Sequence, residues 1–276
     1  MNRILAVARN TFREAARNKV MYSLLLFAII LIVSALALGE LSVHEEGRMI
    51  RDVGLFGIDV FSVLIAIFVG VNLLYKELSL KTVYTILPKP IARWEFILGK
   101  WFGVMATLVV QIVVMGAVLF ATLLAAQPDP GGGAGGPASA WAGGLDLALL
   151  KTLWLFVMNV TIVTSVAMLF SAFTTPFLSG LFSLGVFLVG RQVPDLQQLE
   201  ARIGGALGYL LGLATRVLPN LQLYTPSGVI AGADRVSVHR QFVSAAYLGS
   251  VTAYALCYSA LVLGLAMFIF RRRDFV

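Results

Sequence analysis

The chain has 276 residues, of which 59% are hydrophobic and only 13% are charged. Soluble domains carry about 25% charged residues, so this composition excludes a soluble globular protein and indicates an integral membrane protein. The net charge of +7 does not indicate nucleic-acid binding, because the basic residues fall in short clusters between long uncharged runs.

Residues 4–19 have the period of an amphipathic helix. One side is apolar and the other carries an arginine at every fourth position: Leu5, Ala8, Phe12, Ala15 and Ala16 against Arg9, Arg13 and Arg17. This pattern predicts a helix on the inner leaflet, with membrane lipid as a partner, since its cations suit anionic lipid. A basic tail that only sets topology explains the sequence equally well.

Six apolar runs are candidates for crossing a membrane, whose hydrocarbon core of roughly 30 Å takes about 20 helical residues. The sequence predicts an all-α membrane protein, forming a single domain over residues 1–276, with six spans. These spans cover about residues 20–39, 54–75, 101–126, 152–173, 177–190 and 242–270. Pro176 divides one long uncharged run, so the fourth and fifth spans are predicted to form a tight antiparallel hairpin.

The distribution of charge predicts that both termini are cytoplasmic. Under the six-span interpretation, one side of the membrane holds 13 Lys and Arg with 4 acidic residues, and the other side holds 8 with 10. The side richer in Lys and Arg is the cytoplasmic one. The first apolar run exceeds the roughly 7 to 15 residues typical of a signal peptide, so we expect it to remain as a span.

The segment after the second span, residues 75–100, is the most specific part of the sequence. Pro88 and Pro90 forbid a continuous helix, so the second span is predicted to extend into the cytoplasm, break, and restart as a short helix near Ile91. If this short helix lies flat on the membrane, Phe96 faces the cytosol, where a groove of a partner protein could receive it.

The segment between the fifth and sixth spans is too apolar for an ordinary loop. Residues 203–218 predict an external helix that lies at the outer interface or re-enters the membrane. Gly204, Gly208 and Gly212 recur at every fourth position, which permits close approach of helices. Either a dimer contact or outer gate, or packing against the chain's own spans, accounts for them. A second small-residue face on the last span is predicted to pack within the chain: Ala245, Gly249, Ala253 and Cys257.

Asp59 is the one acidic residue well inside a predicted span. A charged carboxylate at mid-membrane costs about 2.5 to 3.5 kcal/mol on insertion scales. One hypothesis places Asp59 in the polar lining of a substrate path, paired with Arg191. The favoured alternative is an interfacial carboxylate that reaches water.

Motifs of soluble and membrane enzymes are missing from the sequence. The glycine-rich tract of residues 131–136 is not followed by Lys-Ser or Lys-Thr, so it is no phosphate-binding loop and is predicted to be a flexible external linker. We find neither a His-Glu-x-x-His nor a Gly-x-Ser-x-Gly motif. His44, His239 and the single cysteine are isolated. We therefore predict no catalytic, cofactor or metal-ligating residue, and any ATP hydrolysis must come from another polypeptide.

Several motifs around the second and third spans resemble the membrane subunit of ABC-2 type transporters. They are Lys76-Glu77, Lys81-Thr82, Leu87-Pro88 with Pro90, Arg93 and Gly99-Lys100. The opening residues 8–15 and the ending residues 270–275 also resemble the permease branch associated with multicopper-enzyme maturation. The resemblance runs nearly end to end.

The resemblance implies that residues 76–100 include a coupling helix that docks on a separate cytoplasmic ATPase. The interface would include Glu77, Lys81, Thr82, Pro88, Pro90, Arg93, Phe96 and Lys100. It also implies a unit of two permease chains, identical or different, and two ATPase copies in the inner (cytoplasmic) membrane. ATP and Mg²⁺ would then bind to the ATPase, with no cofactor in this chain.

The function implied is export or translocation of an unidentified substrate. Copper is indicated only by the branch, because clustered Met, Cys or His ligands are absent from the sequence. A nontransporting scaffold or mechanotransmitter driven by the same kind of ATPase is one alternative. A secondary transporter is another, although the sequence shows no convincing internal repeat.

Overall fold

The computed structural model describes residues 2–40, 46–79, 92–126, 147–203, 205–225 and 244–272. Every regular element in these ranges is helical, which confirms the predicted all-α class. In chain order the elements are α1 (Asn2–Ala15), α2 (Lys19–Glu40), α3 (Glu46–Ser79), α5 (Arg93–Ala125), α6 (Leu147–Ser171), α7 (Pro176–Arg191), α8 (Val193–Ile203), α9 (Gly205–Val217), the 3₁₀ helix η2 (Leu221–Tyr224) and α10 (Ala245–Arg272).

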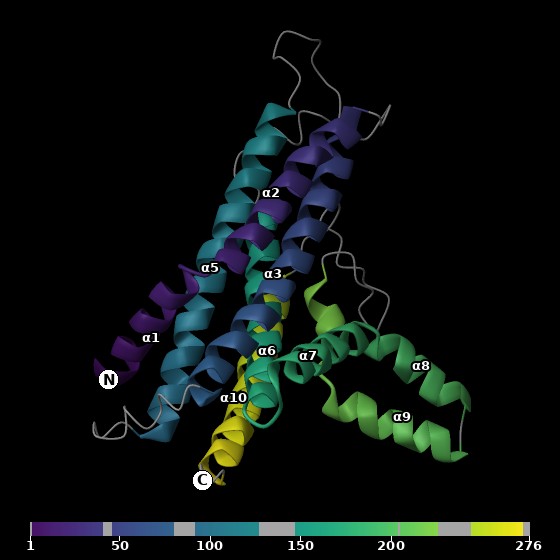
Figure 1. Cartoon of the computed structure of the whole chain (residues 1–276). Coiled ribbons are helices and arrows are strands. Elements are labelled where there is room, and N and C mark those ends of the chain that lie inside the picture. Colours follow the sequence, from purple (N-terminus) through teal and green to yellow (C-terminus); the bar gives the residue numbers. More distant parts are fainter. Residues whose placement is uncertain are drawn as a thin grey trace.

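The five long helices α2, α3, α5, α6 and α10 form a bundle, and the N- and C-termini lie at the same end of it (Figure 1). Each contains a stretch long and apolar enough to cross a membrane. These stretches are Lys19–Ala37, Met49–Asn72, Trp94–Ala125, Ala148–Ser171 and Ala245–Phe270. Five of the six predicted spans are therefore confirmed as candidate spans, within a few residues at most ends.

The fifth predicted span differs from expectation. The turn before it is confirmed, because α6 ends at Ser171 and Pro176 begins α7, where the missing proline N–H is not needed. However, the 16 residues of α7 reach only about 24 Å. The chain then bends by 63° into the more polar α8, so a sixth span exists only if this bent pair counts as one.

Helices α8 and α9 pack on each other and project from one side of the bundle (Figure 1). The turn between them needs Gly205, whose φ of 72° lies in the left-handed region that favours glycine. A helix lies within residues 203–218 as predicted, namely α9, and its external location stays a prediction. Its partner α8 was not predicted.

Helices α3 and α6 are the centre of the bundle. In their most apolar windows 67% and 72% of residues are buried, against 22% to 39% in α2, α5 and α10. Small side chains let the two central helices approach closely, since a Cβ at Gly70 would lie 3.3 Å from the Ala167 Cβ. The outer helices α2, α5 and α10 expose large apolar side chains, as a lipid-facing surface requires.

Candidate functional site

The start of α5 is the first region of functional interest, because it follows the predicted coupling segment. Helix α5 begins at Arg93, and the Glu95 carboxylate accepts a hydrogen bond of 3.1 Å from the backbone N–H of Ala92. This bond satisfies a donor at the helix N-terminus, where a negative side chain is also favourable. The helix then continues without interruption to Ala125.

The prediction of a short, separate helix before the third span is therefore wrong for the described residues. Residues 93–100 are the first turns of the span itself. Because the helix stands upright in the bundle, Phe96 does not face the cytosol and is only 9% exposed. Trp94, two residues earlier, is 50% exposed.

Phe96 and Lys100 pack inside the cytoplasmic end predicted for the bundle. The Lys100 ammonium lies 5.2 Å from the centre of the Phe96 ring, a cation–π contact. The cluster around them joins the ends of three helices and contains Ile97, Met168, Ala172, Leu263 and Phe270. These two predicted interface residues are thus buried in this chain. Lys81, Thr82, Pro88 and Pro90 lie outside the described residues, as do the side chains of Glu77 and Arg93.

Helix α1 packs directly against α5, a contact that the sequence analysis missed. A Cβ at Gly99 would lie 2.7 Å from the Val7 Cβ, and one at Gly103 would lie 2.6 Å from the Ala8 carbonyl oxygen. The two helices therefore touch backbone to backbone. The signal for this contact was present in the sequence as two glycines four residues apart, Gly99 and Gly103.

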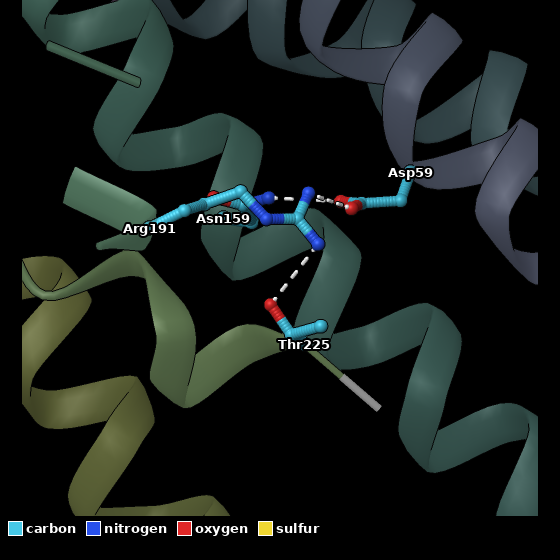
Figure 2. A network of polar contacts seen from close by, with 4 residues as sticks. All are labelled: Asp59, Asn159, Arg191 and Thr225. Atoms are coloured by element: carbon cyan, nitrogen blue, oxygen red, sulfur yellow. Dashed lines mark hydrogen bonds and ion pairs between the residues drawn. The ribbon is translucent and has the colours of Figure 1, made fainter. Parts of the chain in front are cut away.

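The second region is a buried polar network between α3, α6 and α7 (Figure 2). The Arg191 guanidinium donates through Nη1 to Asp59 Oδ2 at 2.5 Å and through Nη2 to Thr225 Oγ1 at 3.2 Å. Asn159 Nδ2 donates to Asp59 Oδ1 at 3.0 Å. The Arg191 guanidinium also lies 5.5 Å from the centre of the Phe187 ring. This network thus connects four separate parts of the chain: α3, α6, α7 and the end of η2.

The network bears on part of the two hypotheses for Asp59, and its place in a substrate path stays a prediction. Its predicted pairing with Arg191 is confirmed. The favoured alternative, a carboxylate reaching water, is wrong because Asp59 is only 4% exposed. Asn159 and Thr225 were not recognised from the sequence, because single polar residues in apolar or loop segments carry no periodic signal.

A row of tyrosines on α10 holds the segment that follows α9. Tyr258 Oη donates to the Val217 carbonyl at 3.1 Å and Tyr247 Oη to the Leu223 carbonyl at 2.8 Å. Tyr254 Oη accepts from the backbone N–H of Asn220 at 3.1 Å. The three tyrosines are spaced by seven and four residues, so they share one helical face. We call them the tyrosine row.

The segment they hold, residues 217–225, is the strap between α9 and the polar network. It contributes one bond in the other direction, since Tyr224 Oη donates to the Val251 carbonyl at 3.0 Å. Burial raises the pKa of Tyr224 well above its usual range, with lesser effects from Tyr254 and Tyr247, so this hydroxyl stays protonated and donating. The strap therefore lies between α10 on one side and Arg191 on the other.

We expect replacement of all three tyrosines of the row by phenylalanine to loosen the strap. Neutral hydrogen bonds contribute about 0.5 to 1.5 kcal/mol each, and those measured in membranes average about 0.6, so the local opening free energy should fall by about 2 kcal/mol. Hydrogen exchange of the Asn220 amide should accelerate. Tyr209→Phe, in exposed α9, is the matched control and should change nothing. Unchanged exchange in the triple variant would contradict the clamping role.

The glycines of α9 pack within the chain. A Cβ at Gly212 would run into the Glu200 carboxylate of α8, and one at Gly208 would lie 3.5 Å from the Glu200 carbonyl oxygen. Of the two hypotheses for these glycines, the structure thus shows intrachain packing for Gly208 and Gly212. The contact is with α8, not with a long span. Gly204 lies outside the described residues.

The small-residue face of α10 does the opposite of what was predicted. Ala245, Gly249, Ala253 and Cys257 are all exposed, and no heavy atom in the described part of the chain comes within 4 Å of a Cβ built at Gly249. The prediction that this face packs within the chain is therefore wrong. Helix α10 turns its tyrosine row to the strap instead, because those side chains find backbone partners there.

Together the fold and these two regions define a polytopic helical membrane protein. Its helix α5 runs from the end of the bundle where the chain termini lie into the bundle core. The chain matches the ABC-2 family transporter protein family over residues 5–275, and it belongs to that family. No curated protein matches it significantly. Membership makes the chain a membrane permease component of an ABC transporter and confirms the family-level resemblance. The multicopper branch stays a prediction.

Proposed function

We propose that this permease subunit couples ATP hydrolysis by a separate cytoplasmic ATPase to export or translocation of a substrate. The observation that carries the proposal is the family match over nearly the whole chain, residues 5–275, together with the five apolar helices long enough to span a membrane. In this proposal two permease chains act with two ATPase copies in the cytoplasmic membrane. ATP and Mg²⁺ bind to the ATPase.

The continuity of α5 supports this coupling role. The helix runs from Arg93 to Ala125 without a proline, so a displacement at its first turn reaches the opposite end of the bundle without a hinge. Residues 80–91, where the partner is proposed to dock, directly precede it in the chain. A force applied to that segment would enter the membrane through α5, accompanied by the α1 helix that is packed against it.

The same proposal places both termini in the cytoplasm. The N- and C-termini lie at one end of the bundle (Figure 1). The six-span interpretation assigns the clusters of Lys and Arg in residues 3–19, 76–100 and 271–273 to the same side of the membrane as the termini. Cytoplasmic segments carry such an excess of positive charge. This orientation puts residues 76–100 within reach of a cytoplasmic ATPase.

Asp59 has a defined place in this proposal. Because Arg191 neutralises it, Asp59 does not offer an unpaired charge to a passing substrate. We propose that Asp59 does not contact the substrate. Through Arg191 it holds the end of α7 and the strap against α3. A path-facing role would require the ion pair to open during the cycle.

Co-purification with an ATPase tests the proposal. We expect the ATPase encoded beside this chain to co-purify with it, and Lys81→Glu to reduce its recovery about tenfold or more, because like-charge contacts cost several kcal/mol at an interface. Arg202→Glu, at an exposed position on α8, is the matched control and should leave recovery unchanged. Full activity of the chain without any ATPase would refute the proposal. Vanadate-sensitive solute flux in liposomes separates a transporter from a nontransporting mechanotransmitter.

A further inference from the structure

Helix α1 has three separate faces, and among the described residues one of them packs closely on another helix, α5. The face toward α5 contains the buried Thr11 and Ala15. Arg13 lies about 160° around the helix from Thr11 and aligns with Arg9 one turn before it, and Arg17 follows in the turn two residues after the helix ends at Ala15. All three arginines are exposed. We call these three residues the arginine ladder.

Between the docked face and the arginine ladder lies an apolar sector. Its members are Leu5, Phe12 and Ala16, and Leu5 is 70% exposed. In the sequence pattern, Leu5 shares one apolar side with Ala8 and Ala15. The structure separates them, because Ala15 is fully buried while Leu5 is exposed.

We propose that the arginine ladder and the adjoining apolar sector form a binding surface for anionic phospholipid headgroups, and that α1 transmits its occupancy to α5. Guanidinium groups bind phosphate oxygens in a bidentate manner, and a zwitterionic headgroup offers no net charge in return. The apolar sector places Leu5 and Phe12 where acyl chains begin. Helix α1 is held at that depth, because α2 starts only four residues after it ends.

Transmission follows from the contact between α1 and α5. A Cβ at Gly103 would lie 2.6 Å from the Ala8 carbonyl oxygen and 2.6 Å from the Thr11 Cβ, so the two backbones leave no slack between them. A force on the arginine ladder therefore bears on the first turns of α5. The docked face and the lipid face do not overlap, so α1 can hold both partners at once.

This proposal does not depend on the coupling role, because it concerns the chain alone. Lipid selectivity is measured on the full chain in vesicles with a fluorescent label at Leu5→Cys, after Cys257→Ser removes the native cysteine. The quenchers are nitroxide-labelled phosphatidylglycerol and phosphatidylcholine at equal mole fraction. We expect labelled phosphatidylglycerol to quench several-fold more strongly than labelled phosphatidylcholine. The difference should shrink in 0.5 M salt, where the screening length for electrostatic interactions is only about 4 Å.

Variants of the arginine ladder separate charge from other causes. Arg9→Gln/Arg13→Gln/Arg17→Gln should equalise the two quenchers, whereas lysine at the same three positions should retain most of the preference. Equal quenching in the parent chain would overturn the proposal. Unchanged preference in the glutamine variant would overturn it as well, since the ladder would then not be the lipid site.

Transmission has its own readout, the thermal unfolding midpoint of the full chain in nanodiscs. Phosphatidylglycerol should raise the midpoint by about 3 to 6 °C over phosphatidylcholine, and the glutamine variant should lose this gain. Gly103→Leu should keep the lipid preference at the label but lose the gain, because α1 is forced off α5. Gly249→Leu, at a position with open space, should keep both. If Gly103→Leu does not fold, Gly99→Ala serves the same purpose. If Gly103→Leu or Gly99→Ala kept the full rise of the unfolding midpoint in phosphatidylglycerol, transmission through α1 would be refuted.

Discussion

Replacing Arg191 with methionine is expected to lower the free energy of unfolding by about 3 kcal/mol. The substitution leaves the Asp59 carboxylate, which is 4% exposed, without its counter-ion, and such losses cost about 3 to 5 kcal/mol at buried pairs. The lower end of that range applies because a quarter of the Arg191 side chain is exposed. Thr225 loses its donor at the same time. Reversible unfolding in mixed micelles measures the effect.

A double variant isolates the ion pair from the rest of the network. Asp59→Leu/Arg191→Met removes both charges, so no unpaired carboxylate remains, and most of the lost stability should return. Asp59→Asn is the mild control, because its amide oxygen can still accept the bond from Arg191. Equal losses in Arg191→Met and in the double variant would show that the loss does not come from the unpaired Asp59 carboxylate.

The second large effect is expected at the contact between α1 and α5. Gly103→Ala should destabilise the protein by about 1 to 3 kcal/mol, because the new Cβ would meet the Ala8 carbonyl oxygen at 2.6 Å and backbone cannot move aside as a flexible side chain can. The measurement is the same unfolding experiment, supplemented by hydrogen exchange of α1. The exchange protection of α1 should drop more than that of α6.

The matched control, Gly180→Ala, is not expected to lower the stability of the protein. Gly180 also lies inside a helix, but no heavy atom of the described residues comes within 4 Å of a Cβ built there. Gly180→Ala should therefore be neutral or stabilising by up to about 1 kcal/mol, through helix propensity alone. If Gly103→Ala behaved like Gly180→Ala, the close packing of α1 on α5 would be disproved.

Both predictions concern elements that connect distant parts of the chain, and these were the hardest to foresee. The sequence offered Arg191 as the partner of Asp59 in only one of two hypotheses, because a lone carboxylate in an apolar run favours a counter-charge. Their other partners, Asn159 and Thr225, come from α6 and from the end of η2. No local pattern relates residues so far apart, so the network as a whole needed the tertiary structure.

Small-residue motifs show the same limit. The sequence contains three sets at helical spacing, of which one was overlooked and one was assigned wrongly. The glycines at 99 and 103 dock α1, those at 208 and 212 pack on α8, and the small residues around Gly249 stay exposed. A small side chain permits close approach, but whether another helix arrives there depends on the path of the whole chain.

The sequence by itself determined the class of protein, the existence of five of the six predicted spans and the cationic face of α1. Each of these follows from a local rule: the cost of placing polar groups in lipid, or the 3.6-residue period of a helix. Only the tertiary structure decided the inward direction of Phe96, the break between α7 and α8, and the use of the tyrosine row. The physical reason is that contacts with distant segments set the rotation of a helix about its own axis. Which of the possible contacts form depends on the packing of the whole chain.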